Sequence, residues 1–181
     1  MKNTLIISLL FGVSLLSCQK DPCAGITCEN DAECVNGICD CPPQYTGPSC
    51  GQEVPPNKMI VAAITLLDYP PTDSGGAGWD LFDGPDVFIT ISKGGVELYQ
   101  STFVEDLTAE DYGWTVNFEF TDPEATYNIS VWDYDDGLTA DDFMGGANFT
   151  PYKSGKDFPE FFFVCEGCPV SFQFAFLSYF H

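Results

Sequence analysis

The amino-acid sequence predicts an all-β protein in which a small disulfide-rich module precedes an eight-stranded antiparallel β-sandwich. Three observations support this fold class. Six cysteines lie within residues 23–50, short apolar segments separated by turn residues follow from residue 58 onwards, and none of these segments carries a convincing helical pattern. Many short strands with glycine and proline between them are typical of a sandwich.

The N-terminus predicts export and a lipid anchor. Lys2 precedes an apolar stretch over residues 5–16, which is too short to span a bilayer comfortably and indicates a signal peptide over residues 1–17. Leu15-Leu16-Ser17-Cys18 resembles the lipobox of bacterial lipoproteins, in which the peptide is cut before a cysteine that carries diacylglycerol. The resemblance implies a protein of the bacterial cell envelope, at the outer membrane or cell surface, anchored through Cys18 with residues 18–22 as its lipidated N-terminus.

Two alternatives remain open in this region. An ordinary secretory signal followed by an unrelated cysteine would give a soluble exported protein instead of an anchored one. Residues 19–21 resemble the short tag that sends lipoproteins of one Gram-negative phylum to the cell surface, and they would serve equally well as plain linker.

The composition excludes one class of partner and favours another. The 181 residues carry 27 acidic side chains against 6 lysines and arginines, a formal net charge of −21. Nucleic-acid binding depends on basic residues that neutralise phosphates, so we expect no nucleic-acid partner. The same negative field attracts divalent cations.

The cysteine content indicates an oxidising compartment. If Cys18 carries lipid, eight of the nine cysteines remain, and we expect them to pair. The segment of residues 23–50 has few apolar residues and is too short to bury a sufficient core, so disulfides must hold it together. Spacing alone leaves fifteen connectivities for its six cysteines.

The closing part of this segment resembles an EGF-like domain. Cys39-Asp-Cys41 is followed by Tyr45, Gly47 and Cys50, which is the specific end of that family's pattern. The resemblance implies the pairs Cys23–Cys34, Cys28–Cys39 and Cys41–Cys50. Because Asp21 is the one carboxylate just before the first cysteine, we expect no calcium in this module. It would act as a rigid spacer or, alternatively, as a protein-binding module, and residues 51–57 with their two prolines form a short stiff linker.

Residues 58–181 predict the eight strands of the sandwich. The segments are rich in valine, isoleucine and phenylalanine, several alternate in polarity, and glycine, proline or aspartate separates them. The expected strands are residues 59–67, 87–92, 96–101, 114–120, 127–132, 143–149, 158–164 and 170–179.

Acidic residues concentrate in two connections between these strands. One cluster contains Asp68, Asp73, Asp80, Asp83 and Asp86, and the other contains Asp133, Asp135, Asp136, Asp141 and Asp142. So many carboxylates at one end of a sandwich would repel one another unless a hard cation neutralised them. Calcium takes about 6–8 oxygen ligands in a flexible geometry, so it is the cofactor we expect.

An EF-hand does not fit these residues, because Gly137 and Met144 stand out of register with its glycine and bidentate glutamate. The stretch Asp80-Leu-Phe-Asp-Gly-Pro-Asp86 and the stretch from Trp132 to Gly145 resemble the first and third calcium loops of C2 domains. The resemblance implies a C2-type sandwich over residues 58–181, with a permuted topology in which residues 170–179 supply the strand that usually comes first.

The same resemblance assigns site residues. Asp80 and Asp86 match the ligands of the first loop, and Asp133 and Asp135 match those of the third. The last ligand is Asp141 by counting from Asp133, or Asp142 by the register of the following Phe-Met-Gly. Three apolar residues at the expected loop tips would insert into a bilayer or, alternatively, pack within the loops: Leu81, Phe82 and Leu138.

The remaining chemistry predicts no enzyme. Cys165 and Cys168 lie between two expected strands without a βαβ pattern, which favours a structural disulfide over a redox pair. His181 is the one histidine, so no serine–histidine or cysteine–histidine machinery is available.

Two functions therefore follow from the sequence. The first is a calcium-dependent module that binds phospholipid or a protein partner on a cell surface. The second is a structural or adhesion protein in which calcium only stiffens the loops.

Overall fold

The computed structural model describes residues 20–80, 84–108, 111–135, 140–156, 158–175 and 177–181. Its strands are all antiparallel, and none of the described residues forms a helix, which confirms the all-β fold class. Nor do these residues contain a helix long and apolar enough to cross a membrane. The signal peptide and Cys18 lie outside the described residues, so the lipid anchor stays a prediction.

The N-terminal module is a disulfide-held pair of small hairpins. Strand β1 (Glu33–Val35) pairs with β2 (Ile38–Asp40), and β3 (Tyr45–Thr46) pairs with β4 (Gln52–Glu53). The disulfides are Cys23–Cys34, Cys28–Cys39 and Cys41–Cys50, the pairs that the EGF-like pattern implies. Within residues 20–50 the buried side chains are those of Cys39 and Cys50, so cross-links replace a hydrophobic core.

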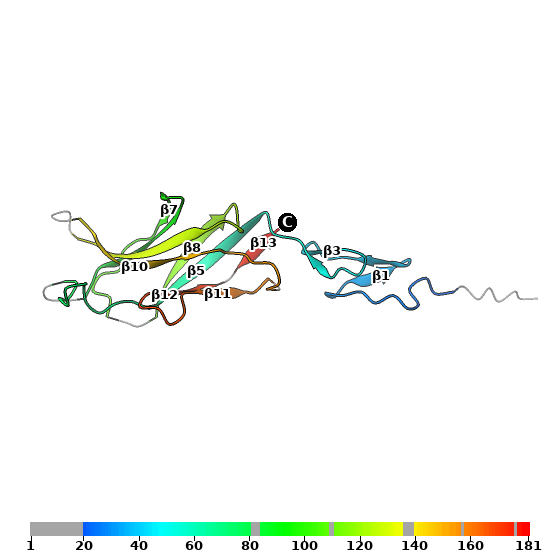
Figure 1. The fold of residues 1–181 in the computed structure, drawn as a ribbon, viewed down its shortest axis with the longest axis horizontal. Helices are drawn as coiled ribbons and strands as arrows, with labels where there is room; N and C mark the ends of the chain where they lie inside the picture. The colour runs from blue at the N-terminus through cyan, green and yellow to red at the C-terminus, as the bar shows by residue number, and fades with distance from the viewer. Residues whose placement is uncertain (1–19, 81–83, 109–110, 136–139, 157, 176) are drawn as a thin grey trace, which may run out of the picture.

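The larger unit is a sandwich of two antiparallel sheets (Figure 1). One sheet has the order β10-β9-β6-β7, and in the other β5 lies between β8 on one side and β12 and β13 on the other, with β11 at the edge. The strands are β5 (Lys58–Asp68), β6 (Val87–Lys93), β7 (Val96–Gln100), β8 (Tyr112–Phe120), β9 (Tyr127–Asp133), β10 (Asp142–Phe149), β11 (Phe161–Val164), β12 (Ser171–Ala175) and β13 (Ser178–Phe180).

The C-terminal part corrects two expected strands. The strand expected over residues 170–179 forms two short strands, β12 and β13, which follow β5 in the same register, with Ala175 opposite Ala63 and Ser178 opposite Ile60. The strand expected from residue 158 begins at Phe161, because Phe158 has a left-handed backbone with φ of 48° and Pro159 has no N–H to donate.

The position of β12 and β13 agrees with a permuted topology. Both strands lie beside β5, the first strand of the sandwich. A strand moved from the start of a domain to its end would keep its place beside the strand that used to follow it. Between β11 and β12, Cys165 and Cys168 form the expected disulfide in the connection, and the N–H of Cys168 donates to the carbonyl of Cys165 at 2.9 Å.

The core lies between the two sheets. Strand β8 alternates buried and exposed residues because one of its faces is solvated, whereas β6 and β9 are almost continuously buried. An aromatic cluster fills the end of the core nearest the small module: Phe120 contacts Tyr127, Phe149 and Phe174 with ring centroids 4.9 to 6.2 Å apart.

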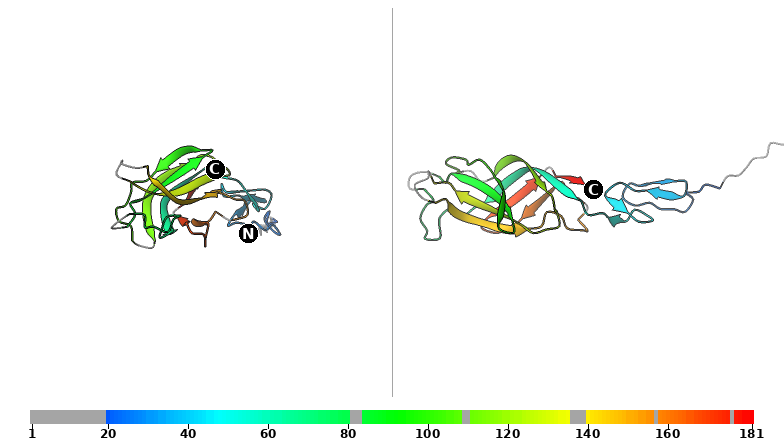
Figure 2. Two further views of the ribbon diagram at one scale, coloured as in Figure 1. Left: turned by 60° about the vertical axis from the view of Figure 1, so that its left-hand side comes forward. Right: turned by 90° about the horizontal axis from the view of Figure 1, so that it is seen from above.

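The module is docked onto the sandwich by specific contacts. The Glu53 carboxylate accepts hydrogen bonds from the Tyr152 hydroxyl at 2.9 Å and from the N–H of Gly155 at 2.6 Å. The ring of Tyr45 meets the ring of Phe158 edge-on at 5.8 Å. The molecule is consequently an elongated rod with the module at one end (Figures 1 and 2).

We expect Tyr152→Phe to loosen this junction. The substitution removes one hydrogen bond to a charged group, which is worth about 1.5–3 kcal/mol of stability. Double electron–electron resonance between spin labels on the module and on the sandwich should show a broader distance distribution. Tyr179→Phe is the matched control, since its hydroxyl bonds to Pro159 within the sandwich. An unchanged distribution in Tyr152→Phe would contradict the role of this contact.

Candidate functional site

The sheet topology brings the predicted ligands to one end of the sandwich. Strand β6 starts just after Asp86, the adjacent β9 ends at Asp133, and β10 starts at Asp142. Val87 and Asp142 both lie directly opposite Asp133 in the sheet. The connections before β6 and after β9 therefore emerge side by side, at the end of the rod that is farthest from the small module (Figure 2).

Asp133 is the buried carboxylate of this end. Its residue is only 1% exposed, and its Oδ1 accepts a hydrogen bond from the N–H of Asp86 at 2.8 Å. Burial raises the pKa of Asp133 to about 6; the Asp86 N–H opposes this shift, and the charges of Asp80, Asp135 and Asp86 add to it. Three predicted ligands therefore lie close enough to Asp133 to repel its charge.

Hydrogen bonds connect the acidic loops to one another. The carboxylate of Asp86 accepts from the N–H of Asp106 at 3.0 Å, and its carbonyl accepts from the N–H of Tyr134 at 2.8 Å. In the third loop the N–H of Asp135 donates to the Asp141 carboxylate at 3.2 Å. Asp141 and Asp142 are both exposed, and the hydrogen bond from Asp135 within the third loop favours Asp141 as the last member of the site.

A third loop, the connection between β7 and β8, also contacts the acidic loops, and the sequence did not predict this contact. Besides the bond from Asp106, the N–H of Leu107 donates to the carbonyl of Pro85 at 2.8 Å, and Val104 pairs with Val87. Tyr69 donates its hydroxyl hydrogen to the carbonyl of Leu107 at 2.6 Å. This loop makes its contacts through backbone N–H and carbonyl groups, so no side-chain pattern in the sequence signals them.

One aspartate of the first cluster, Asp73, stabilises a turn within its own loop instead. Oδ1 of Asp73 accepts hydrogen bonds from the N–H groups of Gly75 and Ala77, both at 2.8 Å. Trp79 fixes the same loop by donating its indole hydrogen to the carbonyl of Pro70 at 2.7 Å. Asp73 is therefore a structural residue, in the manner of aspartates that bond to backbone groups just after them.

The predicted loop tips lie outside the described residues: Leu81, Phe82 and Leu138, together with the acidic residues Asp83 and Asp136. The described part of this end carries another exposed aromatic group. Phe103, 42% exposed, stacks on Tyr134 with ring centroids 4.6 Å apart.

The donor set is that of a hard cation, but the described residues do not form a closed site. Every predicted ligand is a carboxylate, the donor type that calcium prefers. Among the residues described, however, no group of three or more histidine, cysteine, aspartate or glutamate side chains converges as metal ligands do. The described carboxylates thus surround Asp133 without enclosing a metal position.

Comparisons with known proteins gave structural likenesses only. No family model and no curated protein matches the sequence. A solved C2 domain is 16% identical over 67% of this chain and 97% of its own, with a TM-score of 0.44. The first C2 domain of plant Extended Synaptotagmin 1 is 16% identical over 71% of this chain and 99% of its own, with a TM-score of 0.48. Human GIVD cytosolic phospholipase A2 is 15% identical over 65% of this chain and 15% of its own, with a TM-score of 0.40. Likeness at this level carries no argument about what the chain binds.

We expect Asp133→Asn to stabilise the calcium-free protein. A carboxyl group whose pKa rises on folding binds its proton more tightly in the native state, so its ionisation costs stability as the pH rises from about 4 to about 6. Asparagine keeps the oxygen that accepts from Asp86 and removes the charge. Urea denaturation in a chelator should show a gain of about 1–3 kcal/mol near pH 7 and little gain near pH 4.

The control for this measurement is Asp68→Asn, at an exposed position at the end of β5. This variant should show no pH-dependent gain. A loss of stability in Asp133→Asn at every pH would contradict the electrostatic interpretation and assign the carboxylate to packing alone.

Proposed function

We propose that this chain is a lipid-anchored surface protein whose acidic loops bind calcium and, through the ion, phospholipid headgroups or an acidic protein partner. The observation that carries the proposal is the carboxylate of Asp133, which is buried among like charges. A buried charge without an opposite charge is costly, and a divalent cation removes that cost.

The proposed ion would be held by the carboxylates around Asp133. Asp80, Asp86 and Asp135 are its electrostatic neighbours, and Asp141 is joined to Asp135 by a hydrogen bond. Calcium tolerates such a set from several loops because its coordination is flexible, and it accepts water and carbonyl oxygens as further ligands. Extracellular modules bind calcium with dissociation constants of about 10⁻⁴–10⁻³ M, which suits an exported protein.

The direction of the rod supports a ligand that is not the anchoring membrane. The described chain starts at Lys20 in the small module, and the acidic loops lie at the opposite end of the rod (Figure 1). The proposed acyl chains on Cys18 would hold the module end. Calcium-bound loops at the far end would then meet the phospholipid or protein of another surface.

A second function is favoured by the hydrogen bonds within the site. The loops are already tied together by the bonds from Asp106 to Asp86 and from Asp135 to Asp141. Calcium would in that case only stiffen the loops of a structural or adhesion protein. Neither proposal assigns a catalytic step to the chain.

A calorimetric calcium titration tests the metal assignment. With the soluble chain of residues 19–181, we expect calcium to bind with a millimolar or lower dissociation constant and Asp133→Asn to weaken it about tenfold or more, since one of a few carboxylate ligands is lost. Asp68→Asn should leave the binding unchanged. No heat at millimolar calcium would overturn the assignment.

A liposome assay separates the two functions. We expect the same soluble chain to cosediment with vesicles of phosphatidylserine and phosphatidylcholine in calcium but not in chelator. Phe82→Ser should abolish this binding and leave the calcium-dependent rise in melting temperature intact. If calcium raises the melting temperature and no vesicle binds, phospholipid is excluded as the ligand and the structural function survives.

A further inference from the structure

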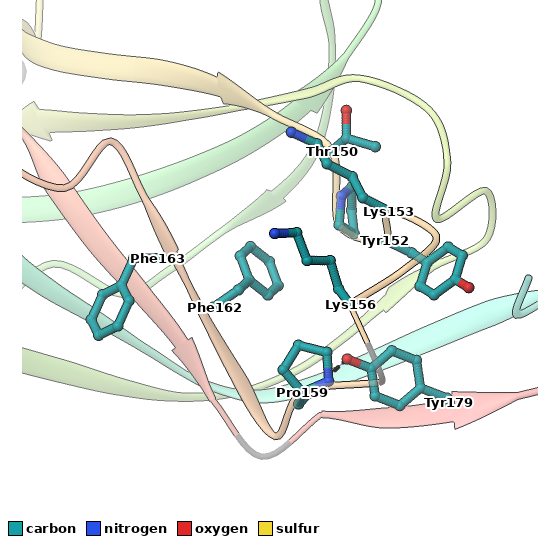
Figure 3. Close-up of a pocket in the computed structure, with 9 residues that line it drawn as sticks. Thr150, Tyr152, Lys153, Lys156, Pro159, Phe162, Phe163 and Tyr179 are labelled. Atoms are coloured by element: carbon teal, nitrogen blue, oxygen red, sulfur yellow. Dashed lines mark hydrogen bonds between the residues drawn. The ribbon is translucent and has the colours of Figure 1, made fainter. Parts of the chain in front are cut away.

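A second candidate site lies at the other end of the sandwich, near the junction with the small module. It is a groove of about 310 Å³ between the connection after β10, strand β11 and strand β13 (Figure 3). The residues that line it are Thr150, Pro151, Tyr152, Lys153, Lys156, Pro159, Phe162, Phe163 and Tyr179.

The apolar part of this groove is rigid. The ring of Phe162 stacks on Phe174 at 4.8 Å and contacts Phe149 at 6.0 Å, so the core holds it in place. Tyr179 donates its hydroxyl hydrogen to the carbonyl of Pro159 at 2.7 Å, which fixes another wall. The hydroxyl of Tyr152 is bonded to Glu53 and points away from the groove (Figure 3).

The charged part of the groove consists of Lys153 and Lys156. The sequence has six lysines and no arginine. Lys58 pairs with Glu119 at 3.0 Å, and Lys93 pairs with Asp122 at 2.8 Å. By contrast, Lys153 and Lys156 are exposed, and within the described chain neither has a carboxylate within 4.0 Å of its ammonium.

Two lysines that form no ion pair with any described residue, beside an apolar groove, are notable in so acidic a protein. With a net charge of −21, carboxylates to pair with are abundant. The two ammonium groups instead flank aromatic rings and prolines, and the side chain of Lys156 extends over the groove beside Phe162 (Figure 3). An apolar surface with a few placed charges is the usual composition of a site for a small amphiphilic ligand.

We propose that this groove binds a single-chain amphiphile with an anionic head, a carboxylate or a phosphate. The apolar chain lies on Phe162 and Pro159, and the head lies between the ammonium groups of Lys153 and Lys156. A volume of 310 Å³ is at the lower end of the usual range for small-molecule sites, about 300–1,000 Å³, so a short or medium chain fits and a two-chain phospholipid does not.

The site is independent of the proposed calcium function. Its residues belong to the junction end of the sandwich, while the acidic loops lie at the opposite end (Figures 1 and 2). Failure of calcium binding would leave this proposal untouched, and ligand binding here should not respond to a chelator.

Calorimetry with decyl probes below their micelle concentrations tests the proposal on the soluble chain of residues 19–181. We expect decanoate or decyl phosphate to bind about tenfold more tightly than decanol, and decyltrimethylammonium not to bind, because the lysines attract an anionic head and repel a cationic one. A preference between decanoate and decyl phosphate identifies the head group.

The lysine variants provide the matched comparison. Lys153→Gln with Lys156→Gln should reduce the affinity for the anionic probes to that for decanol, whereas Lys58→Gln with Lys93→Gln should change nothing. Phe163 is 44% exposed and lines the groove, so Phe163→Ser should weaken the binding of the anionic probes and of decanol to a similar extent. Equal binding of decanoate and decanol to the unaltered chain, or anionic binding that survives loss of both lysines, would overturn the proposal.

Discussion

The burial of one carboxylate, that of Asp133, links the fold of this protein to its candidate site. Asp133 is at once the last residue of β9 and the acceptor that holds the N–H of Asp86 at the start of β6. Asp133 lies opposite Val87 of β6 and Asp142 of β10, and an acidic connection precedes each of these two strands. The charge cannot move away from its neighbours without opening the sheet, so a cation that neutralises it would also stabilise the strand ends.

A second constraint fixes the direction of that site. Glu53 accepts two hydrogen bonds from the connection after β10, and Phe158 contacts Tyr45 of the module and Tyr152 and Tyr179 of the sandwich. The module has almost no apolar core of its own, so its disulfides give it shape and this docking gives it orientation. A module attached by a flexible linker would leave the acidic loops free to face the membrane of the proposed anchor; a docked module holds them away from it.

The sequence was most informative where a local pattern determines the structure. Alternating polarity located strands such as β8, and the resemblance to EGF-like domains implied disulfide pairs that spacing alone left open. It was least informative where a contact depends on loop conformation. Nothing near Asp86 indicates that Asp106 will bond to it, and Tyr152 lies 99 residues from its partner Glu53. The break between β12 and β13 could not be predicted either, because an apolar run of residues does not show where its pairing with the neighbouring strand is interrupted.

The two candidate sites lie at opposite ends of the sandwich and differ in the charge of the side chains that form them. Carboxylates surround Asp133 at the far end, and Lys153 and Lys156 lie beside the groove at the junction end, where Glu53 is already engaged by Tyr152 and Gly155. The far end can therefore attract cations, whereas the proposed groove would attract an anionic head through its two lysines despite a net charge of −21. Because the groove and the acidic loops belong to the same sandwich, a ligand in the groove and a cation at the loops would be presented at a fixed separation, one toward the proposed anchor and one away from it.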